Sequence, residues 1–131
     1  MSIVGIGTDL VATARLTRMQ ADYGERLAAR LLTAPELSAY HAALDAGSEA
    51  GAAFLARRFA AKEAAAKALG CGIGGDAGFH DLHVAHRASG APQLLLTGRA
   101  AQRAERLGVQ RTHLSISDER EHALAMVILE D

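Results

Sequence analysis

The sequence predicts a single α+β domain in which a mainly antiparallel sheet is wrapped around one long central helix. The chain has 131 residues, a length that suits one domain with a modest core, so the domain is expected to span residues 1–131. Residues 52–69 are rich in alanine and contain neither proline nor glycine, which favours one long helix. The last two apolar segments are separated only by a polar turn, which predicts a hairpin and therefore antiparallel pairing.

The first quarter of the chain is predicted to form a strand followed by short helices. Residues 2–9 are rich in isoleucine, valine and glycine, which favours a strand with Asp9 at its exit. Apolar residues then recur at three- and four-residue steps over residues 11–32, and Gly24 marks a break between two short helices.

Residues 33–36, Thr-Ala-Pro-Glu, predict the start of a further helix that runs to about Leu44. The threonine hydroxyl can accept a hydrogen bond from an amide of the first turn, while the glutamate reaches back to the threonine amide. The proline needs no amide partner at that position. Residues 45–51 are predicted to be a loop or a loose helix start, with Ser48 as a candidate N-cap.

Gly70 is expected to end the long helix, and residues 70–78 form a glycine-rich loop. Amides in such a loop can approach an anion closely, although many such loops are ordinary connectors. The remaining sequence predicts strands at 82–87 and 93–97 around a turn at 89–92, a helix at 99–107, and strands at 112–117 and 123–129 around a polar turn at 118–121.

The composition indicates a globule packed with aliphatic side chains. Hydrophobic residues make up 50% of the chain and aromatic residues only 4%, which argues against disorder. The net charge of −1 provides no strong overall attraction to nucleic acid. Cys71 is the only cysteine, which excludes an intramolecular disulfide and fits a reducing cytoplasm. No export signal and no run long enough to span a bilayer are apparent, so a soluble cytoplasmic protein is expected.

Asp9, Glu63 and Lys67 are candidate functional residues. Glu63 and Lys67 lie four positions apart, and alone they would be a surface ion pair worth about 0.3 kcal/mol. Phe59 lies one turn before Glu63, however, so both charged residues border the core-facing stripe of the helix. Asp9 could simply begin a turn after its strand. Together, Asp9 and Glu63 could offer two hard oxygen ligands to a magnesium ion whose shell is completed by phosphate and water.

Other nucleotide and metal sites are not favoured. The first glycines do not continue into the dinucleotide-binding pattern, and the later glycines follow a helix instead of opening one. On an extended strand His80 and His86 would lie roughly 20 Å apart with His83 on the other face, so these three residues cannot share one metal ion.

Four motifs match those of a known family in order. They lie at residues 5–10 (Gly-Ile-Gly-Thr-Asp-Leu), 58–70 (Arg-Phe-Ala-Ala-Lys-Glu-Ala-Ala-Ala-Lys-Ala-Leu-Gly) with the following 72–74 (Gly-Ile-Gly), 90–92 (Gly-Ala-Pro) and 113–117 (His-Leu-Ser-Ile-Ser). From about Ile3 to Ile128 the chain resembles the small holo-acyl-carrier-protein synthases of the 4′-phosphopantetheinyl transferase superfamily. The resemblance implies the fold of these transferases.

The resemblance further implies transfer of the 4′-phosphopantetheine group from coenzyme A to a serine of apo acyl carrier protein, releasing 3′,5′-ADP, in fatty acid biosynthesis. It implies magnesium as the cofactor, with Asp9 and Glu63 as ligands and Lys67 beside the same phosphates. Glu63, directly or through a metal-bound water, is the candidate acceptor of the serine proton. The alternative is a non-catalytic module that binds coenzyme A or the carrier protein.

By the same resemblance the protein is a homotrimer whose sites lie between subunits. Contacts to coenzyme A are then expected at Arg58, Lys62, Lys67, Gly70, Pro92, His113 and Ser115, with Pro92 and His113 coming from the adjacent subunit. On a strand His113 and Ser115 share one polar face, which is available to a ligand or a neighbour. The alternatives are that Arg58 and Lys62 are solvated residues of the helix surface and that His113 is a hydrogen-bonded, partly buried histidine.

The early helices carry basic residues on common faces, with Arg15 three positions before Arg18 and Arg26 four before Arg30. The resemblance implies that this region binds the acidic acyl carrier protein, with Arg15 as the best single candidate and Met19 as its apolar companion. A solvated charged face is the alternative for the other arginines.

Two positions depart from the family pattern. Asp118 follows Ser-Ile-Ser where relatives usually have a histidine, and residues 64–66 are all alanine where a bulky or hydroxyl residue is common. Neither departure touches Asp9 or Glu63.

Overall fold

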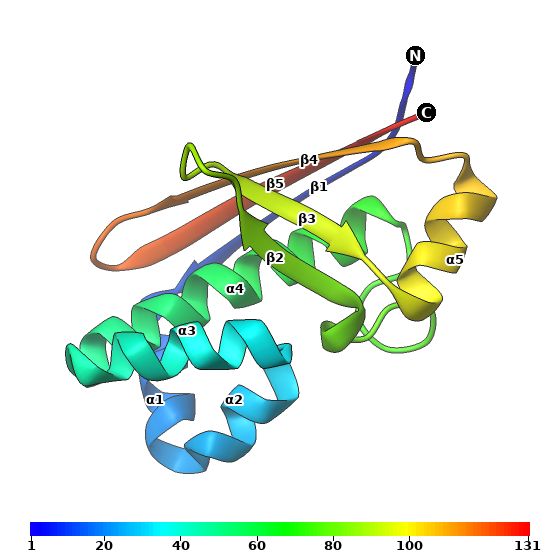
Figure 1. The fold of residues 1–131 in the computed structure, drawn as a ribbon. Helices are drawn as coiled ribbons and strands as arrows, with labels where there is room; N and C mark the ends of the chain where they lie inside the picture. The colour runs from blue at the N-terminus through cyan, green and yellow to red at the C-terminus, as the bar shows by residue number, and fades with distance from the viewer.

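The computed structural model describes residues 1–131 and has an α+β fold (Figure 1). The helices are α1 (Thr13–Tyr23), α2 (Glu25–Leu31), α3 (Ala34–Asp45), α4 (Ser48–Ala68) and α5 (Gly98–Leu107), with a short 3-10 helix η1 (Phe79–Asp81). The strands are β1 (Ile3–Ala12), β2 (Leu82–His86), β3 (Pro92–Leu96), β4 (Arg111–Asp118) and β5 (His122–Glu130). None of the helices combines the length and the hydrophobicity needed to cross a bilayer.

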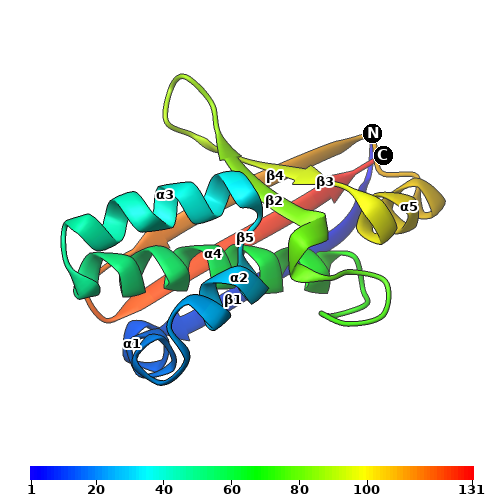
Figure 2. The same cartoon turned by 60° about the horizontal axis from the view of Figure 1, so that its bottom comes forward.

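Two antiparallel sheets lie against the long helix α4. The larger sheet has the strand order β1-β5-β4, and the smaller one pairs β2 with β3. In Figure 1 the larger sheet lies above α4, while α1, α2 and α3 lie below it, and Figure 2 shows the same helix running along the sheet from another side. The predicted antiparallel sheet around a central helix is therefore confirmed.

Helix α4 packs closely on β1 because both surfaces carry small residues. A Cβ atom on Gly5 would collide with the carbonyl oxygen of Ala68, and one on Gly7 would collide with the carbonyl oxygen of Ala64. Ala64 itself is fully buried. The glycines of β1 and the alanines of α4 thus bring the helix that carries the charged candidates against the strand that carries Asp9.

Two boundaries differ from the sequence-based expectation. Strand β1 continues to Ala12, so Asp9 lies inside the strand instead of at its exit, because the ladder with β5 extends through the pairs Leu10–Leu124 and Ala12–His122. Helix α4 begins at Ser48 and its N-cap is Gly47, whose φ of 130° ends the preceding helical path. Ser48 is therefore the first helical residue and not the N-cap.

The predicted helix start at residues 33–36 forms and also creates a buried ion pair. The Thr33 amide donates to Glu36 Oε1 at 2.8 Å, as the capping box requires. The Glu36 carboxylate also accepts hydrogen bonds from Lys62 Nζ at 2.6 Å and from the Val84 amide at 2.8 Å. Burial alone would raise the pKa of Glu36, but the charge of Lys62 and these hydrogen bonds together lower it. One carboxylate therefore joins α3, α4 and β2.

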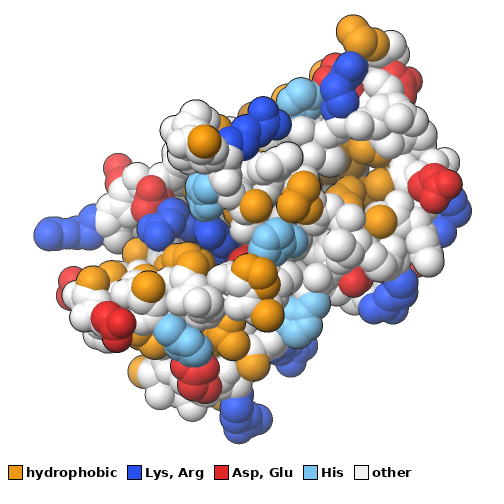
Figure 3. All heavy atoms as spheres, viewed as in Figure 1, with side chains coloured by type: hydrophobic (Ala, Val, Ile, Leu, Met, Phe, Trp, Pro, Cys, Tyr) orange, Lys and Arg blue, Asp and Glu red, His pale blue; other side chains and the backbone are white.

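The surface charge is mixed. On the face shown in Figure 3, basic and acidic side chains are interspersed, in keeping with the net charge of −1. Histidines and apolar side chains lie among them on the same face.

Candidate active site

Strand β1 and helix α4 bring Asp9, Glu63 and Lys67 together. Lys67 Nζ donates one hydrogen bond to Asp9 Oδ1 at 3.0 Å and another to the Thr8 carbonyl oxygen at 2.9 Å. Glu63 lies one turn before Lys67 on α4. Phe59, one turn before Glu63, is buried. Glu63 and Lys67 therefore lie at the edge of the core, as the position of Phe59 in the sequence predicted.

The two carboxylates interact electrostatically. Burial raises the pKa of Glu63, and the negative charge of Asp9 raises it further, whereas the charges of Lys67 and Arg15 lower it. The pKa of Glu63 is therefore above its usual value. Two neighbouring carboxylates that repel each other form an arrangement that a bound cation would stabilise. No group of three or more His, Cys, Asp or Glu side chains gathers anywhere in the molecule, so such a cation would have to complete its shell with other oxygens.

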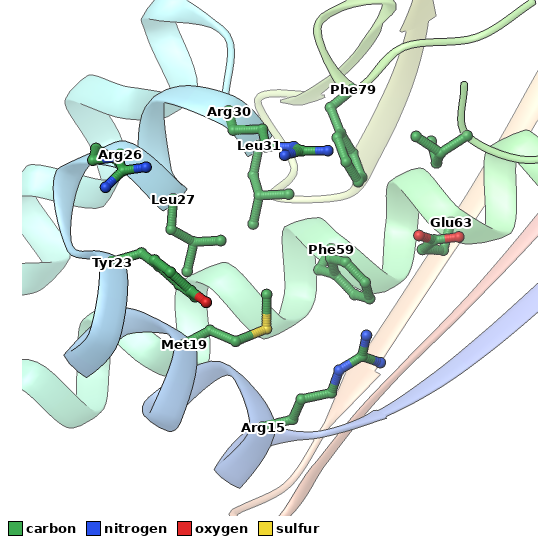
Figure 4. A pocket seen from close by; sticks show the side chains of 11 residues that line it. Arg15, Met19, Tyr23, Arg26, Leu27, Arg30, Leu31, Phe59, Glu63 and Phe79 are labelled. Atoms are coloured by element: carbon green, nitrogen blue, oxygen red, sulfur yellow. The ribbon is translucent and has the colours of Figure 1, made fainter. Parts of the chain in front are cut away.

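Glu63 lines a groove of about 610 Å³ between α1, α2, α4 and the glycine-rich loop (Figure 4). The lining residues are Arg15, Met19, Tyr23, Arg26, Leu27, Arg30, Leu31, Phe59, Glu63, Ile73 and Phe79. In Figure 4 Glu63 stands at one end of the groove, and Tyr23 and Arg26 at the other. The groove therefore has an apolar lining, basic residues and one acidic end.

Arg15 and Met19, the predicted carrier-protein contacts, both face this groove. The Arg15 guanidinium lies 5.1 Å from the centroid of the Phe59 ring, a distance at which a cation and an aromatic ring attract each other. Phe59 thus holds Arg15 toward the Glu63 end of the groove. Arg26 and Arg30 of α2 line the groove as well, whereas Arg18 does not.

The expectation that Lys62 contacts coenzyme A is wrong. Its side chain is 0% exposed, and Nζ donates to Glu36 Oε1, to the Leu31 carbonyl oxygen at 2.7 Å and to the Phe79 carbonyl oxygen at 3.0 Å. Three acceptors satisfy all the donors of an ammonium group. Lys62 points away from the groove because it lies about 100° around α4 from Glu63.

Arg58 lies on the same buried side of α4 but is not fully hydrogen bonded. The residue is 5% exposed, and its guanidinium carbon lies 4.4 Å from the centroid of the Phe54 ring. Arg58 Nε is buried without a hydrogen-bond partner and lies 3.8 Å from Glu36 Oε2. Gly70, another candidate, has a φ of 75° and follows Leu69, the C-cap of α4, as expected for the glycine that ends a helix.

His113 and Ser115 do not join Asp9 within one chain. Both are exposed on β4, whereas Leu114 and Ile116 between them pack against the core, so the predicted separation of faces is confirmed. Helix α4 covers the inner face of this sheet, and the residues of β5 that face it are buried. The sheet therefore stands between His113 and the Asp9–Glu63 pair of the same chain.

Sequence reasoning missed the partner of His113. His113 Nε2 and Glu130 Oε1 are 2.6 Å apart, and Arg111 Nε lies 3.4 Å from the same oxygen. Glu130 is the cross-strand neighbour of Arg111 in the β4–β5 ladder, so only the strand register brings these three residues together. Sequence reasoning also missed Phe79, which lines the groove. Its position as an aromatic residue directly after the glycine-rich loop could have identified it.

The sequence matches the model of the 4′-phosphopantetheinyl transferase superfamily over residues 5–127. A holo-(acyl-carrier-protein) synthase of Vibrio cholerae is 50% identical over 128 residues, which cover 98% of each chain. Among solved structures, that of the holo-(acyl-carrier-protein) synthase of Neisseria meningitidis is 38% identical, with a TM-score of 0.89 over 99% of this chain and 100% of that one.

A further solved structure is that of the holo-(acyl-carrier-protein) synthase of Bacillus anthracis in complex with coenzyme A (3′,5′-ADP). It is 35% identical, with a TM-score of 0.76 over 97% of this chain and 96% of that one. The matched region includes Asp9, Glu63 and Lys67. The chain belongs to the holo-(acyl-carrier-protein) synthases of the 4′-phosphopantetheinyl transferase superfamily.

Proposed function

We propose that this protein transfers the 4′-phosphopantetheine group of coenzyme A to a serine of apo acyl carrier protein and releases 3′,5′-ADP. The reaction takes place in the cytoplasm and serves fatty acid biosynthesis. The observation that carries the proposal is the Glu63 carboxylate, which lines one end of a groove and interacts with Asp9 and Lys67, in a chain of this family. A module that only binds coenzyme A or the carrier protein is not favoured, because binding alone does not require a carboxylate with a raised pKa.

The donor set of Asp9 and Glu63 fits magnesium. Both are hard oxygen donors, and burial together with the charge of Asp9 raises the pKa of Glu63. A divalent cation held by these two residues would offset their repulsion. A bound magnesium ion would neutralise charge on the diphosphate of coenzyme A as the phosphorus is attacked. The hydrogen bond from Lys67 holds the Asp9 carboxylate in place and keeps a positive charge beside the same site.

The residues suit an in-line transfer. The serine oxygen of the carrier protein forms a bond to the phosphorus, the bond between that phosphorus and 3′,5′-ADP breaks, and the departing ADP retains the electron pair. Glu63 accepts the serine proton, directly or through water. The Lys67 ammonium offsets the negative charge that develops on the leaving phosphate.

The active assembly is a homotrimer with sites shared between subunits. The outer face of the larger sheet exposes Ile6, Leu10, Leu124 and Met126, an apolar surface that association would remove from water. His113 and Ser115 lie on the same face of the sheet as these apolar residues. In the trimer they would therefore contribute to the site of a neighbouring chain. Pro92, at the start of β3, completes the proposed contribution to coenzyme A.

The remaining contacts follow from the groove. Arg15 and Met19 would bind the acidic carrier protein, with Arg15 already held by Phe59. Arg58, whose Nε has no hydrogen-bond partner, and Gly70 remain candidate contacts to coenzyme A. Lys67 would contact the diphosphate.

The test is to incubate the purified protein with coenzyme A, magnesium and an apo acyl carrier protein, and to measure the mass of the carrier. We expect a mass gain of one phosphopantetheine group, lost when a chelator removes the magnesium. No gain with a carrier that another transferase modifies would exclude the proposed activity and leave the binding module. A gain that persists in the chelator would exclude the metal requirement.

A further inference from the structure

We propose that Asp76 and Arg103 are positioning residues whose ion pair holds the glycine-rich loop, residues 70–78, as a wall of the groove beside Glu63, where the loop contacts the pantetheine arm of coenzyme A. This inference rests on the transferase function proposed above. Neither residue belongs to the motifs that identified the family.

Arg103 joins the end of α4 to the far part of the loop. Its Nε donates to the Leu69 carbonyl oxygen at 2.6 Å, and its Nη1 donates to Asp76 Oδ2 at 2.9 Å. Leu69 is the C-cap of α4, where carbonyl groups lack a helical partner and a positive charge is favourable. Arg106 Nη2 adds a longer contact of 3.3 Å to the same oxygen of Asp76.

Without this ion pair the loop has few bonds of its own. The amides of Cys71 and Gly72 donate to the Ala66 carbonyl oxygen, and the Gly74 amide donates to Ala77. The Gly78 amide donates to Asp81 Oδ2 at 3.0 Å, and Ala77 is fully buried, so both ends of the loop are anchored. The glycines at 72, 74 and 75 accept many backbone conformations. Among residues 72–77, the bonds from Arg103 and Arg106 to Asp76 are the only hydrogen bonds made by a side chain, so they tie the middle of the loop to α5.

The middle of the loop forms part of the site. Ile73 lines the same groove as Glu63 and Phe79, so a displacement of the loop moves an apolar wall beside the reacting group. Among the parts of coenzyme A, the pantetheine arm is uncharged and carries methyl groups, whereas the nucleotide carries phosphates. An apolar wall of Ile73 and Phe79 suits the arm and does not suit the nucleotide.

The test compares the binding of two ligands, coenzyme A and 3′,5′-ADP, by calorimetry with the full-length protein in magnesium. Asp76→Asn is expected to raise the Kd for coenzyme A about fivefold, the upper end of the effect of one partly exposed ion pair, and to leave the Kd for 3′,5′-ADP unchanged. The KM for coenzyme A should rise by the same factor while kcat stays the same. Arg103→Lys, which keeps the charge but cannot donate two divergent bonds, is expected to act in the same direction.

Two controls separate positioning from a general loss of structure. Asp76→Glu retains the carboxylate and is expected to restore the wild-type values. Glu105→Gln removes one negative charge from the exposed side of the same helix α5 and is expected to change neither Kd.

Equal weakening of both ligands, or wild-type binding by both Asp76→Asn and Arg103→Lys, would overturn the inference while the transferase function stands. A wild-type protein that neither binds coenzyme A nor modifies the carrier would overturn both.

Discussion

The carboxylate of Glu63 is held where burial and the neighbouring Asp9 both oppose its charge. Lys67 and Arg15 compensate for only part of this, so the pKa stays raised. Such an arrangement is unfavourable for stability, and perturbed groups of this kind occur preferentially at functional sites. Two predictions belong to this residue.

The first prediction concerns turnover. Glu63→Gln is expected to reduce kcat by about 100-fold or more, because the amide is a poor ligand for magnesium and cannot accept the serine proton. The measurement is the rate of carrier mass gain, with Glu105→Gln as the matched control that retains the wild-type rate. Wild-type turnover in Glu63→Gln would remove Glu63 from both proposed roles.

The second prediction concerns stability in a chelator, where no metal can bind. The pKa of Glu63 in the folded protein lies above its ordinary value of 4.5, so between these two values the native state binds more protons than the unfolded state. This group therefore makes stability fall as pH rises through that window. The Glu63→Gln variant does not lose stability in this way, because the amide does not ionise. Its Tm should therefore exceed that of the wild type at pH 7 and match it at about pH 4. A lower Tm at pH 7 would show that the carboxylate is stabilising.

Among the secondary-structure elements, α4 carries two lysines in different environments. Lys62 is fully buried and bonded to Glu36, whereas the Lys67 side chain is 52% exposed and bonded to Asp9. Both lie in one predicted helix with the same local sequence character, and only the neighbours of the helix distinguish them. The sequence therefore identified the helix but placed Lys62 in the wrong role.

These two lysines provide the third prediction. Lys62→Met leaves the buried Glu36 without its partner and is expected to lower the free energy of unfolding by about 3–5 kcal/mol. Lys67→Met removes a partly exposed pair and should lower it by about 1 kcal/mol or less while greatly reducing turnover. Urea unfolding and the carrier assay measure the two effects, and equal destabilisation by both substitutions would contradict the assignment.

The contact between β1 and α4 provides the fourth prediction. Gly7→Ala places a Cβ against the Ala64 carbonyl oxygen and should destabilise the protein by about 1–3 kcal/mol, because the strand must move away from the helix. Gly75→Ala is the control, since no atom lies within 4 Å of the Cβ it adds. Urea unfolding that shows the same stability for both variants would mean that the two elements are not held this closely.

At the scale of the whole molecule, the larger sheet separates two groups of candidate residues. Asp9 and Glu63 belong to the side that α4 covers, while His113 and Ser115 lie on the outer face with the exposed apolar residues of β1 and β5. A site that uses both groups requires two chains. The order of motifs in the sequence does not predict which face of the sheet each residue lies on or whether chains assemble. Both depend on which face of the sheet the helices cover.

The fifth prediction tests shared sites. Asp9→Ala and His113→Ala, each impaired alone, are expected to recover activity when the two chains are mixed and assembled, because some interfaces then combine an intact Asp9 with an intact His113. Adding Leu124→Arg to both chains should abolish the recovery by breaking the assembly. Leu95→Arg is the matched control, since Leu124 is 45% and Leu95 42% exposed but Leu95 lies on the smaller sheet. Mixed trimers that stay inactive would exclude shared sites.

Helix and strand periodicity and short motifs are local properties, so the amino-acid sequence was enough to predict the main strands and helices, the capping box at residues 33–36, the family and the candidates Asp9, Glu63 and Lys67. The folded structure was needed to find that Asp9 lies inside β1, that Lys62 is buried and that Arg103 bonds to Asp76. These outcomes depend on how elements distant in sequence pack, since the packing alone determines whether a charge meets a partner, a groove or water.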